Sequence, residues 1–558
     1  MRIFSVIWVV YYASQIGASP GPKFPHNAVT AVCPIAAKIG AETLKLGGNA
    51  VDAAVTVAFV MAVTWPEAGN IGGGGFMLIH REDRPPEVVE YRECAPLAAH
   101  PTFFQKGDSP NSGKAVGVPG TVAGLFLAHK RHGKLPWYDL VEPARKLAAE
   151  GFPVSNGLAR SLNRVLTAYP QAQFPDLHKF FGQPKGTSRW VLGMVLKQPE
   201  LSETLTRIRD LGHDGFYKGE VAKGLIQSVV KLGGSMTLED LERYQSQVKA
   251  PLRGTYKGYT ILVPGPPSAG GMVLLQMMGI LEAGGLGKHP RNSMETIHLF
   301  TEAARLSYRD RARFAGDENF HIVPSHLWEK NRVVELSRLL DPSRFLREEE
   351  LGPPLPLSNP AFNPGESTTH FSVMDENGMS VANTYTLEDS YGNHHVSKGG
   401  FLMNNELGDF NWFPGQTDKT GRVGTPPNQI APEKRMLSSQ TPVVVLKGNQ
   451  AFIVSGSPGG RTIPNTVNQI LLNIMEFGMN TQEAVDFPRI HHQWMPESLR
   501  AEKHGEAQWE NSLKGIGKKG MKVVRSPQGD AHTLVRRLGQ KTIEAGVDSR
   551  IEGAAFGN

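Results

Sequence analysis

The hydrophobic positions in the first two thirds of the chain follow the helical period. Residues 35–46 place apolar side chains every three or four positions and end at Gly47, a residue type that often terminates helices. Asn49 then stands where a helix N-cap is expected, before the almost wholly apolar segment 50–65. That segment is shorter than the roughly 18 residues of a membrane-spanning helix, so it predicts a buried core helix. Further helices are expected over 121–152, 201–232 and 293–314.

Strand patterns replace the helical period in the last third of the chain. Residues 370–374 and 379–386 flank Asp375-Glu376-Asn377-Gly378, whose Asn-Gly pair favours a hairpin turn. A second hairpin is expected from 443–446 and 451–455. Two antiparallel hairpins in one region predict an antiparallel sheet.

The proline-rich stretch 353–365 separates these two parts. It cannot continue a helix or a central strand, so it is the strongest linker candidate in the chain. A last helix is expected over about 462–477, after the second hairpin. Helices early in the chain and hairpins late in it predict an α+β fold, in which helices cover antiparallel sheets.

The composition is that of an ordinary globular protein. Of the 558 residues, 40% are hydrophobic and 20% are charged, which excludes a disordered chain, and glycine does not recur at every third position as in collagen. The length allows about three or four average domains, or fewer large ones. The net charge of +6 is a small excess without a run of five Lys or Arg, so we expect no nucleic-acid partner.

Residues 1–18 have the layout of a secretory signal peptide. Arg2 supplies one positive charge, residues 3–13 are apolar, and small residues stand near Gly17 and Ala18. The apolar stretch is too short to span a bilayer. We therefore expect a secreted or periplasmic protein.

Side chains that commonly bind metals or act as nucleophiles form no familiar signature. The chain has no His-Glu-x-x-His, P-loop or Cys-x-x-Cys pattern. His394-His395 and His491-His492 are adjacent pairs, and neighbours point to different faces of a strand or helix, so a shared metal is not expected. Cys33 and Cys94 could pair in an exported protein, but two cysteines define no disulfide framework. No metal or cofactor is predicted.

One arrangement, around Thr368, carries a chemical mechanism. The proline-rich stretch leads to Ser367, and a strand begins at Thr368. If the bond between these two residues were cut, Thr368 would carry a free α-amino group beside its own hydroxyl. An α-amine has a pKa near about 8, so it could be the general base for that hydroxyl at neutral pH. β-Propensity alone also explains threonines at the start of a strand.

A second feature is the segment Gly456-Ser457-Pro458-Gly459-Gly460, between an expected strand and an expected helix. Backbone N–H groups and the positive end of a helix dipole converge at such a place, as an oxyanion hole requires. A plain strand-to-helix turn could have the same residues.

Several motifs in one order along the chain together resemble a known family. They include Gly47 to Ala54, Tyr91-Arg92-Glu93-Cys94-Ala95-Pro96, Thr368 to Val373, Asn404 to Phe410, Leu437-Ser438-Ser439, Gly456 to Gly460 and His491-His492-Gln493-Trp494. In these motifs the chain resembles the γ-glutamyltranspeptidases, also called glutathione hydrolases. The similarity extends over roughly residues 27–531.

The resemblance implies the fold and maturation of an N-terminal nucleophile hydrolase. That fold is a four-layer αββα sandwich, made as a precursor that cuts itself between Ser367 and Thr368. The products would be a large subunit, 19–367, and a small subunit, 368–558, held together as a heterodimer in one interleaved domain.

The resemblance also implies a role for each matching residue. Thr368 matches the nucleophile, Thr386 the threonine that orients it, and Gly459 and Gly460 the oxyanion-hole pair. The residues that match the substrate pocket are Arg92, Ser438 and Ser439 for the α-carboxylate of the γ-glutamyl group, and Glu406 and Asp409 for its α-ammonium. A guanidinium and hydroxyls suit a carboxylate, and carboxylates suit an ammonium.

The implied reaction transfers the γ-glutamyl group of glutathione or a related γ-glutamyl compound. The acceptor would be water, an amino acid or a dipeptide, and no cofactor is implied. One alternative on the same scaffold is an acylase for poly-γ-glutamate or for cephalosporin side chains. An inactive scaffold protein is a third alternative, but it would be expected to lose Thr368, Arg92 or the glycine pair.

The chain departs from the family pattern at two places in the pocket. Glu388 stands where many members have asparagine, and it adds a possible third acid near the ammonium. Residues 411–435 are long enough to form a lid over the pocket, but Thr420 and Gly421 stand about where some members carry a lid tyrosine.

Overall fold

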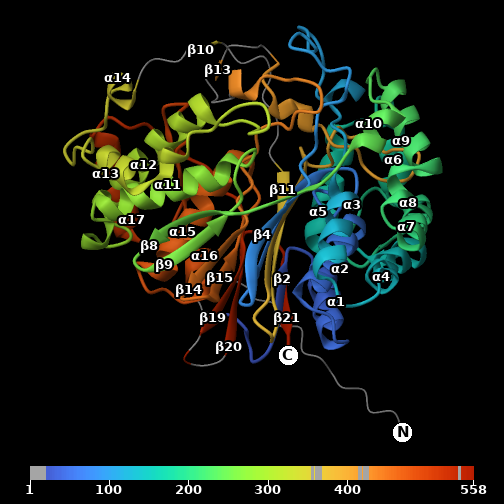
Figure 1. Cartoon of the computed structure of the whole chain (residues 1–558), viewed down its shortest axis with the longest axis horizontal. Helices are drawn as coiled ribbons and strands as arrows, with labels where there is room; N and C mark the ends of the chain where they lie inside the picture. The colour runs from blue at the N-terminus through green and yellow to red at the C-terminus, as the bar shows by residue number, and fades with distance from the viewer. Residues whose placement is uncertain are drawn as a thin grey trace.

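Two seven-stranded antiparallel sheets form the centre of the molecule (Figure 1). The computed structural model describes residues 20–352, 367–412, 426–537, 539 and 542–558, with the backbone of two short strands at 357–358 and 417–418. One sheet has the order β21-β2-β11-β12-β3-β4-β7, and the other has the order β1-β20-β19-β15-β14-β9-β8.

The first sheet joins strands from both sides of the Ser367–Thr368 bond. Its central hairpin, β11 and β12, follows that bond, and β2 and β3 flank the hairpin from the earlier part of the chain. The strands are β21 (Ala554–Gly557), β2 (Ala28–Ala31), β11 (Ser367–Met374), β12 (Ser380–Glu388), β3 (Gly74–Arg81), β4 (Arg84–Glu90) and β7 (Gln247–Lys249).

The second sheet also combines strands from before and after the Ser367–Thr368 bond. Its strands are β1 (Lys23–Phe24), β20 (Thr542–Val547), β19 (His532–Arg537), β15 (Gln450–Ser455), β14 (Val443–Lys447), β9 (Tyr259–Val263) and β8 (Leu252–Tyr256). Smaller pairings lie outside the two large sheets: β5 (Phe152–Pro153) with β6 (Val195–Leu196), β16 (Ile490–His491) with β17 (Leu499–Ala501) and β18 (Val523–Arg525), and β10 (Leu357–Ser358) with β13 (Thr417–Asp418).

The two large sheets stack face to face. An apolar layer that includes Phe76, Leu262 and Leu534 fills the space between them. The hydroxyl of Ser372, on β11, crosses this layer and donates to the carbonyl oxygen of His532 at 2.9 Å. Strands from both sides of Thr368 therefore contribute to each sheet.

Helices cover the outer faces of both sheets, one group on each side (Figure 1). One outer layer holds α1 (Pro34–Lys45), α2 (Ala50–Thr64), α3 (Thr121–His132), α4 (Trp137–Glu150), α5 (Asn156–Ala168), α6 (Pro175–Phe181), α7 (Pro199–Leu211), α8 (Asp214–Tyr217), α9 (Gly219–Lys231) and α10 (Leu238–Arg243). The other holds α11 (Ala269–Ala283), α12 (Met294–Phe314), α13 (Lys330–Ser337), α14 (Glu348–Leu351), α15 (Ile463–Met475), α16 (Thr481–Asp486) and α17 (Ala507–Lys518). The predicted four-layer αββα sandwich is confirmed.

The local signals in the sequence explain several element boundaries. The side chain of Asn49 accepts from the backbone N–H groups of Val51 and Asp52 at 3.0 Å and so caps α2, as expected. The expected helix 121–152 is instead two helices, which are separated at Gly133 to Pro136. The expected helix 201–232 is also interrupted, because Gly212 adopts a φ of +60° that an α-helix cannot hold.

Some expectations concern residues outside the described part of the chain, and others concern a membrane-spanning helix and a disulfide. The signal peptide and the lid positions Thr420 and Gly421 lie outside the described residues, as does the linker 353–365 apart from the backbone of β10. Within the described part of the chain, no helix is both long and apolar enough to cross a membrane. Cys33 and Cys94 are buried and form no disulfide.

Candidate active site

Thr368 lies at the start of β11, where the strand register with β12 is irregular. The shift falls between Ser367 and Thr368, and Thr368 pairs with Thr386 across the hairpin. The Thr368 hydroxyl donates to Oγ1 of Thr386 at 3.3 Å, and the Thr386 hydroxyl donates to the Ser367 carbonyl oxygen at 2.6 Å. The Thr386 hydroxyl therefore contacts both Thr368, the predicted nucleophile, and the Ser367 carbonyl group, which Thr368 is predicted to attack.

Neighbouring backbone holds Thr386 in this position. The carbonyl oxygen of Thr386 accepts from the side-chain amide of Asn70 at 2.9 Å, and Asn70 also accepts from the N–H of Gly73 at 2.9 Å. A Cβ on Gly73 would lie 2.0 Å from the Thr386 carbonyl oxygen. The glycine run at 72–75 therefore lets the backbone approach Thr386 closely.

We expect loss of the Thr386 hydroxyl to slow cleavage of the chain. Thr386→Val keeps the shape of the side chain but removes the group that polarises the Ser367 carbonyl, so cleavage is expected to slow by about 10- to 100-fold. A gel time course of freshly purified protein measures it. Thr386→Ser is the control, because it keeps the hydroxyl; equal rates for the valine and serine variants would contradict the role of this contact.

The glycine segment follows β15 and approaches the same end of β11. Ser372 contacts the Val454 carbonyl oxygen at 3.3 Å, and a Cβ on Gly456 would lie 2.3 Å from Nδ1 of His370. Gly456 therefore lies beside His370, two residues after Thr368 on β11. Burial holds the pKa of His370 well below its usual value, so this imidazole is neutral.

Arg92, which is predicted to bind the donor's α-carboxylate, is buried, and protein oxygens already surround it. Its Nη1 lies 2.6 Å from Oε2 of Glu406, and its Nη2 lies 2.5 Å from Oδ2 of Asp409. Nη1 also lies 3.5 Å from Glu93. Nε and Nη2 donate to the backbone carbonyl oxygens of Met436 and Leu437 at 3.4 and 3.3 Å. The groups expected to bind opposite charges of a substrate therefore bind each other.

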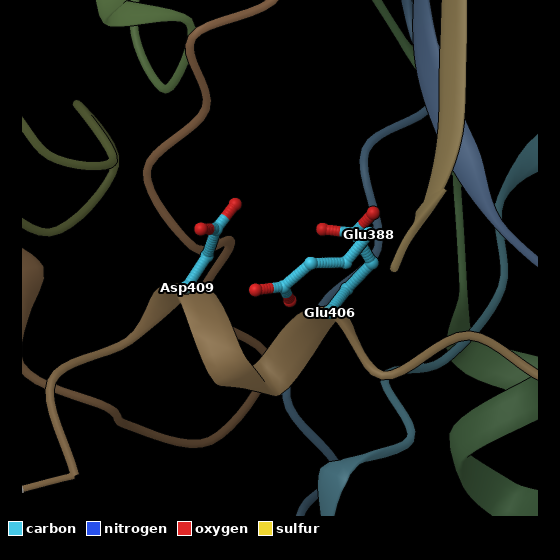
Figure 2. Close-up of side chains that lie close together, drawn as sticks. All are labelled: Glu388, Glu406 and Asp409. Carbon is cyan, nitrogen blue, oxygen red and sulfur yellow. The ribbon is translucent and has the colours of Figure 1, made fainter. Parts of the chain in front are cut away.

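Glu388 joins this ion-pair network from the end of β12. One carboxylate oxygen from each of Glu388, Glu406 and Asp409 lies within 4.8 Å of those from the other two, and Figure 2 shows the three side chains together. Glu388 adopts a left-handed φ of +75°, and Gly408 leaves space for its carboxylate, since a Cβ there would lie 2.9 Å from Oε2. Left-handed φ values in non-glycine residues often occur at functional sites. The predicted third acid does point toward the other two.

The charges of this network shift one another's protonation. Burial raises the pKa of Glu406 well above its usual value, although Arg92 opposes this shift. Burial also raises the pKa of Glu93 to about 7. For Arg92, burial favours the neutral form, but the carboxylates of Glu406 and Glu93 outweigh it and raise the pKa. Among the described residues, no other group of three or more His, Cys, Asp or Glu could hold a metal ion, and in this one Arg92 already supplies a cation.

Ser438 and Ser439 follow the backbone that contacts Arg92. The Ser438 hydroxyl accepts from the backbone N–H of Gln440 at 3.2 Å, and the Ser439 hydroxyl accepts from Nη2 of Arg311 at 3.0 Å. Both serines are buried. Both serines directly follow Leu437, whose carbonyl oxygen accepts from Arg92.

Sequence reasoning missed two kinds of residue at this site. Glu93, directly after Arg92, contributes an acid, but its buried position could not be read from the sequence. Asn404 holds the backbone near Glu406: its side chain donates to the carbonyl oxygens of Gly72 and Gly117 at 2.8 Å and accepts from the Gly117 N–H at 2.9 Å. Asn404 belongs to one of the family motifs, but the motif does not show which backbone groups its side chain contacts.

Comparison with known proteins gives one family. The sequence model of the gamma-glutamyltranspeptidase family matches residues 36–558. The glutathione hydrolase proenzyme of Escherichia coli (strain K12) is 36% identical over 549 residues, which cover 95% of this chain and 90% of that protein. The glutathione hydrolase proenzyme of Pseudomonas aeruginosa is 40% identical over 487 residues, with 84% of each chain covered.

Solved structures agree with this result. A gamma-glutamyltranspeptidase from Helicobacter pylori matches with a TM-score of 0.55 and 32% identity, over 61% of this chain and 97% of that chain. A cephalosporin acylase from Bacillus halodurans matches with a TM-score of 0.86 over 99% of both chains, but its identity is 23%, so this likeness concerns the fold alone.

Proposed function

Because this chain belongs to the gamma-glutamyltranspeptidase family, we propose that it cuts itself before Thr368 and then transfers γ-glutamyl groups from glutathione and related compounds. The acceptor is water, an amino acid or a dipeptide. The observation that carries the proposal is the pair of hydrogen bonds from Thr368 through Thr386 to the Ser367 carbonyl oxygen. They connect the nucleophile to the bond that has to break.

Self-cleavage begins with the hydroxyl of Thr368. Its oxygen attacks the Ser367 carbonyl carbon, the C–N bond breaks, and an ester joins the two residues while the proton passes to the leaving α-amine. Water then hydrolyses the ester, so Ser367 gains a carboxyl group and Thr368 regains its hydroxyl. The products are a large subunit that ends at Ser367 and a small subunit, 368–558, which remain interleaved in the two sheets.

The same hydroxyl then performs the transfer. Thr368 attacks the γ-carbonyl of the donor, its own free α-amine takes the proton, and the N–H groups of Gly459 and Gly460 stabilise the oxyanion. The leaving amine departs with a proton, and a γ-glutamyl ester forms on Thr368. An acceptor amine or water resolves that ester and restores the free threonine.

The acid cluster supports a donor with an α-ammonium group. Glu388, Glu406 and Asp409 offer three carboxylates at one point, and Arg92 supplies the cation for the donor's α-carboxylate. Poly-γ-glutamate ends in such a zwitterionic head, whereas a glutaryl side chain of a cephalosporin has no ammonium.

We expect a γ-glutamyl anilide to be hydrolysed about 10³ times faster, in kcat/KM, than the matching glutaryl anilide. The two differ only in the ammonium group, which the three acids bind by charge-assisted hydrogen bonds. Release of the aniline measures both rates. Equal rates would favour the acylase function.

We further propose that the protein is exported and loses residues 1–18. N-terminal sequencing of the protein purified from its producing cells tests this proposal together with maturation. We expect one terminus near Ser19 and a second at Thr368. A single terminus at Met1 would contradict both proposals.

A further inference from the structure

The two glycines of the proposed oxyanion hole need external support. Gly459 and Gly460 have φ values of +116° and +52°. Glycine adopts many backbone conformations at similar energy, so its N–H direction is not fixed by its own residue. Stabilisation of an oxyanion requires donors that are already aimed before the charge forms. Neighbouring groups must therefore hold the two peptide units.

The Ser457 hydroxyl holds the first peptide unit. The Gly459 N–H belongs to the same planar unit as the Pro458 carbonyl, and in a trans peptide the two point in opposite directions. The only cis peptides among the described residues are at Pro267 and Pro496, so this unit is trans. Oγ of Ser457 lies 2.7 Å from the Pro458 carbonyl oxygen. Fixing that oxygen fixes the direction of the Gly459 N–H.

Thr462 holds the second peptide unit in the same way. The Gly460 N–H shares its trans peptide with the carbonyl of Gly459. That carbonyl oxygen accepts from the Thr462 hydroxyl at 2.8 Å and from the Thr462 backbone N–H at 3.0 Å. Each proposed oxyanion donor thus has a buried hydroxyl at the opposite end of its own peptide unit.

A neighbouring segment, 528–531, packs against the peptide unit between Pro458 and Gly459. The Ser457 hydroxyl also lies 2.5 Å from the Asp530 carbonyl oxygen, so its one proton is shared between two acceptors. A Cβ on Gly529 would lie 2.2 Å from the Pro458 carbonyl oxygen. Buried acids hold both ends of the segment: Glu502 accepts from the Gln528 N–H at 3.0 Å, and Asp548 accepts from the Ala531 N–H at 2.8 Å. The segment 528–531 is a fixed wall for the glycine segment.

We propose that Ser457 and Thr462 are positioning residues that aim the N–H groups of Gly459 and Gly460 at the oxyanion. The inference rests on the proposed function, and it concerns two side chains for which that function requires no role. Neither hydroxyl contacts the donor in this proposal. Their loss misdirects donors that act most strongly in the transition state, so kcat decreases while donor binding persists.

The test measures γ-glutamyl anilide hydrolysis by Ser457→Ala and Thr462→Ala. We expect kcat to decrease by about 10- to 100-fold for each, less than the roughly 10²- to 10³-fold for complete loss of an oxyanion donor, with KM within about twofold. Affinity for a boronic acid analogue of glutamate, which forms a tetrahedral adduct, should weaken by the same factor as kcat. Rates are normalised to the cleaved fraction on a denaturing gel.

Matched controls separate aiming from general loss of stability. Ser455→Ala removes a buried hydroxyl two residues earlier, which contacts Thr533 at 2.7 Å but not the glycine segment. Thr462→Ser keeps the hydroxyl, and both controls should stay within about threefold of the unchanged protein.

A variant in segment 528–531 gives an independent test if Ser457→Ala or Thr462→Ala fails to fold. Gly529→Ala pushes a methyl group against the Pro458 carbonyl and should lower kcat with KM unchanged, whereas Gly505→Ala meets only open space. Unchanged kcat in Ser457→Ala and Thr462→Ala, or a loss confined to KM, would overturn the inference. If the protein without substitutions releases no aniline from the γ-glutamyl anilide, that result would instead refute the proposed function.

Discussion

Thr368→Ala is expected to run as a single uncut chain on a denaturing gel and to lose γ-glutamyl transfer. Without the hydroxyl, no oxygen at this position can attack the Ser367 carbonyl, and the contact with Thr386 disappears. Loss of a nucleophile typically costs about 10⁴- to 10⁶-fold in kcat. Cleavage and activity should therefore fail together, because one oxygen performs both reactions. Gel analysis and aniline release measure the two outcomes on the same sample.

Two control variants show that the effect belongs to one hydroxyl. Thr368→Ser keeps a hydroxyl at the same place and should still cut, although more slowly. Thr369→Ala changes the next residue, which is also buried in β11, and should cut at close to the normal rate. Efficient cutting of Thr368→Ala into two chains would overturn the assignment of the nucleophile.

Local signals were sufficient to predict several elements of the fold. The Asn377-Gly378 signal and the flanking strand patterns predicted the β11–β12 hairpin, in which Met374 pairs with Ser380 and Gly378 adopts a left-handed φ of +85°. Asn49 marked the start of α2 through hydrogen bonds that need only nearby residues. The layered αββα architecture followed from the family resemblance and not from these patterns.

Long-range contacts could not be predicted from patterns along the chain. Residues 554–557 form the edge strand β21 beside β2, near the opposite end of the sequence, and no local signal encodes that pairing. Arg92 and Asp409 are 317 positions apart, so the motifs indicated both groups without indicating that they touch. The sequence predicts Glu388 as a third acid of the pocket. It does not predict Glu93, because its contact with Arg92 depends on which side chains are buried together.

The contact between Arg92 and Asp409 has a consequence for donor recognition. Each nitrogen of Arg92 already faces a protein oxygen, so a donor carboxylate finds no free N–H on it. The Asp409 side chain is 39% exposed, whereas those of Arg92 and Glu406 are 1% exposed. A donor's α-ammonium can therefore reach Asp409 and replace Arg92 there. That exchange frees Nη2 of Arg92 for the donor's α-carboxylate.

We therefore expect the two charges of the donor to be recognised together. With four anilides, γ-glutamyl, glutaryl, 4-aminobutyryl and butyryl, loss of either charge should lower kcat/KM by about 10³-fold. Loss of both should lower it little further. If the two groups were bound independently, the losses would multiply to about 10⁶-fold, since independent contributions to binding free energy add. Multiplied losses would contradict the exchange.

The Asp409→Asn variant gives a test in which the sign of the effect decides. Neutral asparagine binds the guanidinium less strongly, so Nη2 of Arg92 becomes available without an ammonium. We expect hydrolysis of the γ-glutamyl anilide to fall by about 10²-fold, while hydrolysis of the glutaryl anilide rises. Glu433→Gln is the control, because Glu433 is an exposed acid that pairs with Arg243 and not with Arg92. If Asp409 only attracted positive charge, Asp409→Asn would hydrolyse the glutaryl anilide at an unchanged rate. In the unsubstituted protein, the decreases in kcat/KM across the four anilides would then multiply. A rise in the glutaryl rate therefore identifies an arginine that the acid had kept occupied.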